Sequence, residues 1–233
     1  GRFLMSSFHA FYSIGSIAGA GLMTLYLWLG LSPFFAALAC TLVVFGLAVF
    51  FDKGMLPKAP VEHGRKTPKL AIPRGIVLLI GLVLLIAYMA EGAVANWGAL
   101  LLTGFKDFKP EYGALGITVF SITIAIARLK GDFLTQKIGS SAKIIVLCCI
   151  SSSACYLLTI YVLPGFYALT GFGLRGLCLA NLAPSLFTLT GKQKVMPPEL
   201  AISAVTAVGY VCALIGSPFI GLVARHTSLP TSL

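Results

Sequence analysis

The stretch GIVLLIGLVLLIAYMAEGAVANWGALLLT (75–103) contains one charged residue, Glu91, in 29 positions. A helix of about 20 residues crosses a hydrocarbon core about 30 Å thick, so this stretch is long enough to span a membrane. Comparable apolar runs recur on both sides of it. The predicted spans are 8–29, 33–51, 75–103, 113–128, 144–163, 166–189 and 200–224. The sequence therefore predicts an all-α, polytopic membrane protein with seven transmembrane helices.

The composition supports this interpretation. Charged residues make up 10% of the 233 residues and hydrophobic types make up 58%. A soluble domain typically carries about a quarter of charged residues, so this surface is expected to contact the lipid bilayer instead of water. The runs also lack the alternation of apolar and polar residues that is typical of membrane β-strands.

Basic residues predict the orientation. With the N-terminus in the cytoplasm, thirteen Lys and Arg residues fall on inner segments and three on outer segments, namely Lys106, Lys109 and Arg225. This asymmetry follows the positive-inside rule. The net charge of +10 is then a consequence of topology. Because the basic residues are scattered over separate loops, we expect no nucleic-acid partner.

The segment DKGMLPKAPVEHGRKTPKLAIPR (52–74) contains four prolines and two glycines, which favours a flexible cytoplasmic connector. It divides the chain into two helices (1–52), a linker (53–74) and five helices (75–233). This uneven division, and a first residue that is not methionine, predict a piece of a larger protein. An artificial boundary at Gly1 is the alternative.

The segment ARLKGDFLTQKIG (127–139) combines a Gly-Asp pair with flanking basic residues between two spans. It resembles the loop signature of the major facilitator superfamily, although Ala127-Arg128 stands where the commonest pattern has its opening glycine. A solvated charged turn is the alternative. The resemblance implies a gating loop made of Arg128, Gly131, Asp132, Lys137 and Gly139, in which Asp132 pairs with a basic residue or a helix end.

Four further segments resemble the sugar and fucose permease-like branch of that superfamily. They are SSFHAFYSIGSIAGAGL (6–22), MAEGAVANWGALLL (89–102), LCLANLAPSLFTLTG (177–191) and VTAVGYVCALIGSPFIGLVA (205–224). The resemblance implies helices five to eleven of twelve. The linker would then join the two six-helix halves, and the missing helices would be partners of this chain.

By the same resemblance, the function is secondary active transport of a small polar organic solute, sugar-like or another metabolite. The solute would cross the membrane by alternating access, coupled to an ion such as a proton, and the membrane would be a bacterial inner membrane. A seven-helix receptor and a membrane-embedded enzyme are the alternatives. The receptor requires the opposite orientation, and no G-x-S-x-G or H-E-x-x-H motif points to an enzyme.

Glu91 and Arg175 are the ionisable residues deepest inside the predicted spans, and such residues are costly unless they are paired. We expect them to form an ion pair, direct or through water, that contacts the solute or carries coupling; a purely structural pair is the alternative. Hydrogen bonds and a stacking face for the solute are expected from Asn96, Trp97 and Asn181. His9 serves either helix packing or the transport site.

Two other patterns carry no chemistry. GFGLRG (171–176) matches a dinucleotide-binding string but lies inside a span, so its glycines are expected to allow close helix packing. The six cysteines all lie in apolar runs without a C-x-x-C spacing. We therefore expect neither a metal nor a cofactor. Pro184 and Pro218 are expected to kink their helices.

Overall fold

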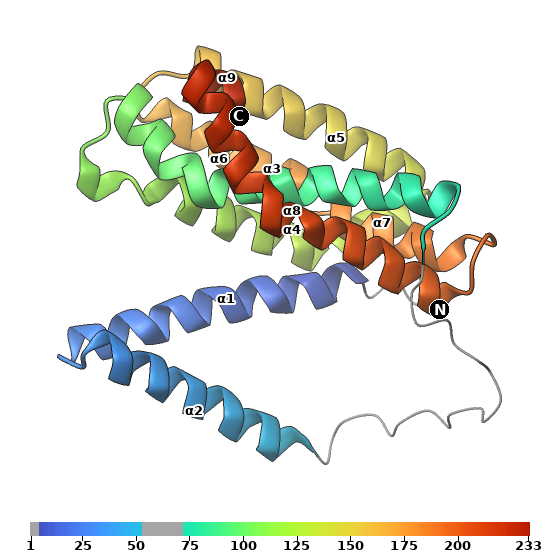
Figure 1. The fold of residues 1–233 in the computed structure, drawn as a ribbon, viewed down its shortest axis with the longest axis horizontal. Coiled ribbons are helices and arrows are strands. Elements are labelled where there is room, and N and C mark those ends of the chain that lie inside the picture. Colours follow the sequence, from blue (N-terminus) through green and yellow to red (C-terminus); the bar gives the residue numbers. More distant parts are fainter. Residues whose placement is uncertain (1–4, 53–71) are drawn as a thin grey trace. The chain divides into compact units, whose positions relative to one another are not determined.

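The computed structural model describes residues 5–52 and 72–233, all of which are helical or in connections, with no strand among them. The chain divides into two compact units, Ile14–Leu70 and the pair of segments Gly1–Ser13 and Ala71–Leu233. Figure 1 shows the helices of both units. The all-α prediction is confirmed. Residues 53–71 of the expected linker lie outside the described residues.

The smaller unit is a helical hairpin. It contains residues 14–28 of α1 (Met5–Trp28) and the whole of α2 (Pro33–Phe51). Gly30 ends α1 with a φ of 86°, and its N–H and that of Leu31 bond to the carbonyls of Leu27 and Tyr26. This is a Schellman motif, which requires a residue that adopts a left-handed backbone conformation.

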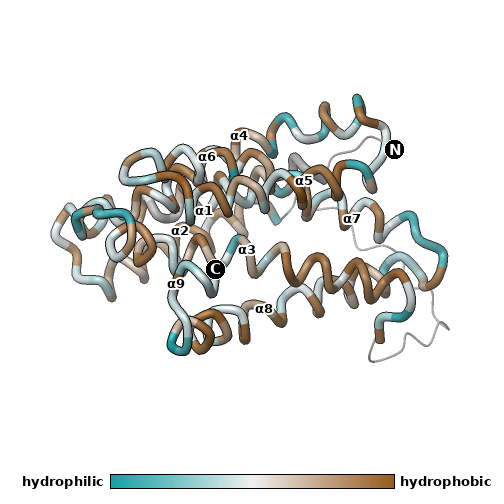
Figure 2. The backbone as a smooth tube through the Cα atoms, turned by 90° about the horizontal axis from the view of Figure 1, so that it is seen from above, coloured by the Kyte–Doolittle hydropathy of each residue, from teal (hydrophilic) through white to brown (hydrophobic). Residues whose placement is uncertain are grey.

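The larger unit holds the remaining helices. They are α3 (Ile76–Phe105), the 3₁₀ turn η2 (Pro110–Tyr112), α4 (Leu115–Ile138), α5 (Ser141–Leu157), the π-turn η3 (Leu158–Val162), α6 (Tyr167–Leu179), α7 (Leu182–Lys192), α8 (Pro198–His226) and α9 (Leu229–Ser232). Figure 2 shows that hydrophobic residues follow most of the helical backbone and that polar residues gather at the turns.

Within this unit, α3 packs mainly on α8, and α6 packs on both α4 and α5. Two glycines of α6 allow these contacts. A Cβ on Gly176 would lie 2.7 Å from the carbonyl oxygen of Phe120 in α4, and one on Gly171 would collide with Thr159 of η3. The expectation that the glycines of 171–176 serve close helix packing is confirmed.

The span expected at 166–189 is interrupted. α6 ends at Leu179 and α7 begins at Leu182, two residues before Pro184. A proline has no N–H to donate, so the carbonyl of Ala180, four residues earlier, is left without its usual helical donor. By contrast, α8 runs through Pro218 as one continuous helix.

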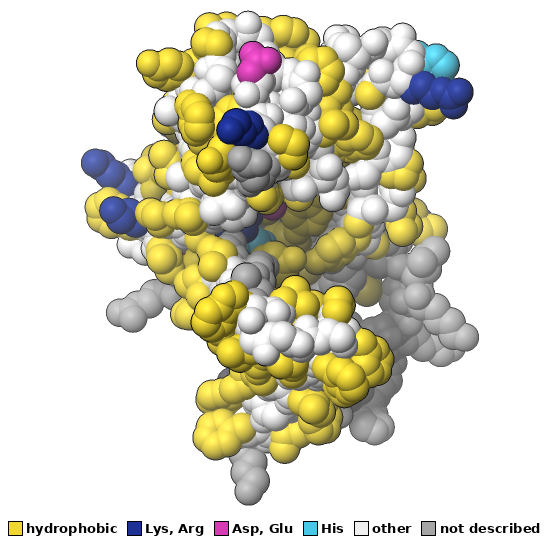
Figure 3. Space-filling view, turned by 90° about the vertical axis from the view of Figure 1, so that its left-hand side faces the viewer, with side chains coloured by type: hydrophobic (Ala, Val, Ile, Leu, Met, Phe, Trp, Pro, Cys, Tyr) yellow, Lys and Arg dark blue, Asp and Glu magenta, His cyan; other side chains and the backbone are white. Residues whose placement is uncertain are grey.

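Six helices are long and apolar enough to cross a membrane by length and composition. They are His9–Trp28, Pro33–Phe51, Ile76–Phe105, Ser141–Val162, Tyr167–Lys192 and Pro198–His226. These correspond to six of the seven predicted spans. The seventh, predicted at 113–128, is α4, whose 24 residues are more polar and extend ten residues further than expected. On the face drawn in Figure 3, hydrophobic side chains are spread widely over the surface and charged side chains are few.

A buried lysine links two elements just beyond a predicted span. Lys106 follows α3 directly and is 8% exposed. Its Nζ donates to the carbonyl oxygens of Ile160 and Leu163, each at 2.8 Å. Burial lowers the pKa of this ammonium below its ordinary value. Because η3 ends at Val162, Lys106 supplies donors to carbonyls that a helix end leaves unpaired.

Candidate functional site

A cavity of about 500 Å³ lies in the larger unit. Its walls come from the first residues of α1, the middle of α3, Arg128 of α4 and the second half of α8. The lining residues are His9, Tyr12, Tyr88, Met89, Glu91, Gly92, Ala93, Asn96, Arg128, Tyr210, Cys212, Ala213, Gly216, Ser217 and Ile220. Its size lies in the range of small-molecule sites.

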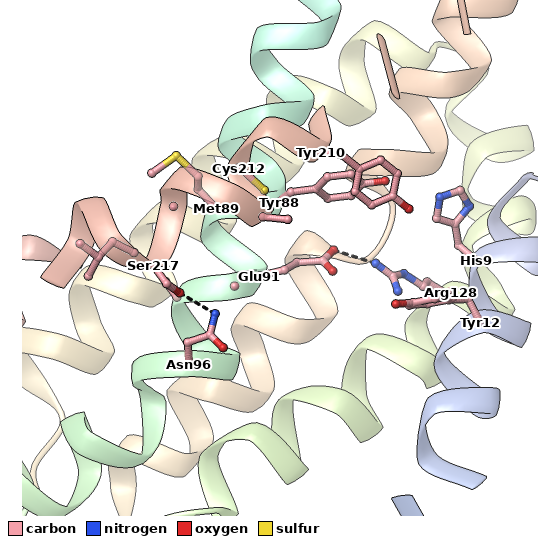
Figure 4. A pocket seen from close by; sticks show the side chains of 15 residues that line it. His9, Tyr12, Tyr88, Met89, Glu91, Asn96, Arg128, Tyr210, Cys212 and Ser217 are labelled. Atoms are coloured by element: carbon pink, nitrogen blue, oxygen red, sulfur yellow. Dashed lines mark hydrogen bonds and ion pairs between the residues drawn. The ribbon is translucent and has the colours of Figure 1, made fainter. Parts of the chain in front are cut away.

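The cavity contains one ion pair. Arg128 Nη2 donates to Glu91 Oε1 at 2.7 Å, and Figure 4 shows the two side chains directed toward one another. The side chain of Arg128 is 5% exposed and that of Glu91 is 28% exposed, so Glu91 has the more open position. A charge-assisted bond of this length is among the stronger hydrogen bonds in proteins.

Both partners lie at the midpoints of their helices. Glu91 is the sixteenth of the thirty residues of α3, and Arg128 is the fourteenth of the twenty-four residues of α4. If these helices cross a bilayer, the ion pair lies near its midplane, where ionisable side chains are costly and usually functional.

Arg128 also bonds to two other elements. Its Nε donates to the carbonyl of Ala180 at 3.3 Å, and its Nη1 donates to Ser13 Oγ of α1 at 2.8 Å. The Ala180 carbonyl is the one that Pro184 leaves free. Pro184 therefore supplies an acceptor for Arg128 and so orients its guanidinium group. One side chain joins α1, α3, α4 and the α6–α7 break.

The expected direct ion pair of Glu91 with Arg175 is wrong, because Glu91 pairs with Arg128 instead. Arg175 is 2% exposed, its Nη2 donates to the carbonyl of Ala90 at 2.7 Å, and its guanidinium carbon lies 3.3 Å from the ring centroid of Tyr156. The sequence places the two charges at similar depths but does not show which helix face each one occupies. Arg175 therefore binds the turn of α3 that carries Glu91, from behind the cavity.

The expected gating loop is largely helical. α4 continues to Ile138, and Arg128, Lys130 and Asp132 lie in its second half, where the apolar pattern had suggested an end. Gly139 ends the helix with a φ of 71°, and Ser140 caps α5 through an acceptor for the N–H of Lys143.

The residues of that segment occupy different environments. Arg128 faces the cavity, Gly131 is buried, Asp132 is half-buried, and Lys137 and Gly139 are exposed. Arg128 is thus a cavity residue and not a loop residue. A gating role for Asp132 stays a prediction.

The other predicted site residues divide into two groups. His9 and Asn96 line the cavity. The His9 ring lies 5.6 Å from that of Phe187, and Asn96 Nδ2 donates to Ser217 Oγ at 2.7 Å, which links α3 to α8. Trp97 instead packs against Gly221 of α8, and Asn181 is buried at the N-terminus of α7. Neither contributes to the cavity lining.

Sequence reasoning missed three tyrosines and one serine. Tyr88 and Tyr210 have ring centroids 5.7 Å apart, and Tyr12 approaches from α1 (Figure 4). The signal was available in α3, because residues 88, 92 and 96 recur at a spacing of four and so share one helix face, and Glu91 follows Tyr88 by three positions. In α8, Tyr210 and Ser217 are seven residues apart, which is two helical turns. Among the described residues, no cluster of three His, Cys, Asp or Glu side chains could hold a metal ion.

Comparisons with known proteins agree with this architecture. No family model matches the chain. A protein of Yersinia pestis named as an uncharacterised MFS-type transporter is 34% identical over 98% of this chain and 59% of its own length. An uncharacterised transporter of Sinorhizobium fredii is 28% identical over 98% of this chain and 60% of its own length, and the membrane protein MosC of Rhizobium meliloti is 28% identical over 67% of this chain and 38% of its own.

Among solved structures, the crystal structure of the Escherichia coli fucose:proton symporter matches with a TM-score of 0.66. The match covers 100% of this chain and 64% of the symporter at 14% identity, so it bears on the fold alone. The chain spans about three fifths of the length of the two transporters above. With bacterial relatives and several membrane-spanning helices, it is a multi-pass protein of the bacterial inner membrane.

Proposed function

Because the chain belongs to the major facilitator superfamily, we propose that it forms part of a secondary active transporter for a small polar organic solute, coupled to an ion. The relatives are named as transporters, and the superfamily is not enzymatic. The midplane cavity with its Glu91–Arg128 pair is the observation that carries the proposal.

The lining of this cavity suits a polar solute. Tyrosine hydroxyls, the Asn96 amide and the Ser217 hydroxyl can exchange hydrogen bonds with the solute, and the tyrosine rings offer apolar faces. The break between α6 and α7 contacts the same ion pair, because the Ala180 carbonyl accepts a hydrogen bond from Arg128. Discontinuous helices at a midplane site are a recurrent device of secondary transporters.

In the domain division that we propose, the cavity lies between two halves that move against each other. In it, residues 1–52 belong to the N-terminal half, 53–74 form the linker and 75–233 belong to the C-terminal half. The Arg128–Ser13 bond then joins the two halves at the level of the solute. Rocking of one half against the other exposes the cavity to each side of the membrane in turn.

Cys212, which lines the cavity, provides a test that requires no knowledge of the solute. The full-length transporter would carry Cys212 as its one remaining cysteine, and a Cys212→Ser variant is the control. A charged thiol reagent should label Cys212 in right-side-out vesicles and also in inverted vesicles, because each face opens in turn. Labelling from one side alone would exclude alternating access and favour a receptor.

A further inference from the structure

Two of the six cysteines meet where α5 packs on α6. Cys155 of α5 and Cys178 of α6 are 23 residues apart in the chain, so their sequence spacing gave no sign of a pair. In the fold, their Sγ atoms lie 3.9 Å apart. Neither residue lines the cavity, so the two thiols are a separate feature of the larger unit.

Both thiols lie in the last turn of their helices. Cys155 is two residues before the end of α5 at Leu157, where the π-turn η3 begins. Cys178 is one residue before the end of α6 at Leu179. Regular helical hydrogen bonding stops at these ends, so the backbone shifts more easily there than in the middle of a helix. A disulfide requires the two sulfur atoms to approach by about 1.9 Å, to about 2.05 Å.

An arginine with unused donors lies beside the pair. Arg175 is three residues before Cys178 on α6, and its Nε and Nη1 atoms are buried without a hydrogen-bond partner. Its guanidinium carbon lies 3.3 Å from the ring centroid of Tyr156, the residue after Cys155. The charge of Arg175 also acts on the Cys155 thiol. Because the thiolate is the reactive form and a neighbouring cation stabilises it, Cys155 is the better nucleophile of the two.

The position of the pair limits which reagents can reach it. Cys155 and Cys178 are both half-buried, and both lie within candidate membrane spans. The large side chains exposed next to them are apolar, as Leu158 and Leu177 are. Transfer of an ion into such surroundings is costly, so a small neutral reagent has the easier access.

We propose that Cys155 and Cys178 are a peroxide-sensitive pair that closes to a disulfide. The Cys155 thiolate attacks one oxygen of the peroxide, the O–O bond breaks, and the leaving hydroxide or alkoxide takes the proton that the thiol lost. Cys155 is then a sulfenic acid. The Cys178 sulfur attacks the sulfenic sulfur, its S–H proton goes to the departing hydroxide, and water leaves. Each disulfide reduces one peroxide by two electrons.

Closure also affects the transport site through the break between α6 and α7. Cys178 is two residues before Ala180, whose carbonyl accepts from Arg128 Nε at 3.3 Å. A covalent bond to α5 fixes the end of α6 and so restricts any rearrangement of the break. This consequence rests on the proposed function, because it requires the break to move during transport. The formation of the disulfide does not depend on it.

The first experiment detects the disulfide in the full-length protein in its membrane. Hydrogen peroxide and cumene hydroperoxide are the probes, because they distinguish a peroxide dissolved in water from one dissolved in lipid. After the free thiols are alkylated, mass spectrometry should find the Cys155–Cys178 cross-link in most molecules with at least one probe, and dithiothreitol should remove it. Cys149→Ser is the matched control and should cross-link like the wild type. No cross-link with either probe would overturn the proposal.

The second experiment assigns the two thiols with dimedone, which labels sulfenic acids. In Cys178→Ser the Cys155 sulfenic acid has no thiol to attack it, so Cys155 should be labelled. In Cys155→Ser, Cys178 should be labelled much less. Arg175→Gln should slow disulfide formation about tenfold, because the thiolate loses its neighbouring cation. Equal labelling of the two variants, or an unchanged rate in Arg175→Gln, would contradict the assigned roles.

The last experiment measures the consequence for access to the cavity. The full-length transporter keeps only Cys155, Cys178 and Cys212, and the same protein with Cys155→Ser controls for direct oxidation of Cys212. Peroxide should slow the labelling of Cys212 from at least one side of the membrane by about fivefold or more, and dithiothreitol should restore it. The control should not change. Unchanged labelling despite the disulfide would overturn the consequence for transport. One-sided labelling before oxidation would contradict the transport function and leave the disulfide standing.

Discussion

The two buried arginines of this protein lie at similar depth in neighbouring helices, yet their surroundings differ. Arg128 has an acceptor for each of its three nitrogens and one of them belongs to a cavity carboxylate. Arg175 has one acceptor, the carbonyl of Ala90, and lies against the ring of Tyr156 away from the cavity. Depth alone therefore does not identify a site. What distinguishes Arg128 is a charged partner that lines the cavity.

The largest expected effect on uptake follows from replacing Arg128, the arginine that lines the cavity. Arg128→Gln deletes the bonds to Glu91 and Ser13 and leaves Glu91 without its counter-ion, so we expect uptake to fall at least 100-fold. Arg128→Lys keeps the charge without the planar fork and should retain a small fraction of uptake. Uptake assays in proteoliposomes check both variants. Wild-type rates in Arg128→Gln would remove this residue from the transport site.

Removing the enclosed arginine should have a smaller effect. Arg175→Gln deletes one charge but leaves the Glu91–Arg128 pair in place, so uptake should fall only about three- to tenfold. The thermal stability of this variant should stay close to the wild-type value. The substitution removes the buried charge together with two buried nitrogens that have no hydrogen-bond partner. A loss of uptake as large as that of Arg128→Gln would make the two arginines equivalent and contradict the comparison.

A substitution in α7 tests how the orientation of the Arg128 side chain is maintained. Pro184→Ala restores an N–H that can bond to the carbonyl of Ala180, and this donor competes with Nε of Arg128. We expect turnover to fall about two- to fivefold with little change in folding. Pro218→Ala is the matched control, since α8 is continuous there and Leu214, four residues earlier, is exposed. Equal effects of the two variants would exclude this role for Pro184.

The smallest effect on transport is expected at Lys106, whose contribution is structural. Lys106→Met leaves one buried and one half-buried carbonyl without a donor, and this should lower the free energy of unfolding by about 1–3 kcal/mol. Uptake should not change. Lys109→Met is the matched control because Lys109 is exposed. Chemical denaturation of both variants measures the difference.

The sequence predicted the helical membrane architecture well, because a bilayer imposes a length and a polarity on every span. It also singled out Glu91, which lines the cavity, since one carboxylate in 29 apolar positions stands out. The partner of Glu91 was predicted wrongly. Pairing depends on the rotation of each helix about its axis, and one glutamate in an apolar run does not set that rotation.

The end of α4 was the other error with consequences. The apolar pattern weakens at Arg128, so the prediction placed this residue in a loop, whereas the helix continues for ten more residues. Hydropathy falls along the sequence both where a helix ends and where a helix packed among others becomes polar. A hydropathy pattern therefore does not distinguish the two cases. The three cavity tyrosines were missed for a related reason, because tyrosine is common in both helix packing and binding sites.

The polar character of α4 also bears on how the protein is made. Alone among the helices of more than 20 residues, α4 is absent from the six candidate spans of the described residues. An arginine at the centre of a nascent helix opposes its insertion by the translocon by about 2.5–3.5 kcal/mol. α3 leaves the ribosome first and carries Glu91 at matching depth. The Glu91 carboxylate, by pairing with Arg128, would thus also assist the insertion of α4 into the bilayer during synthesis.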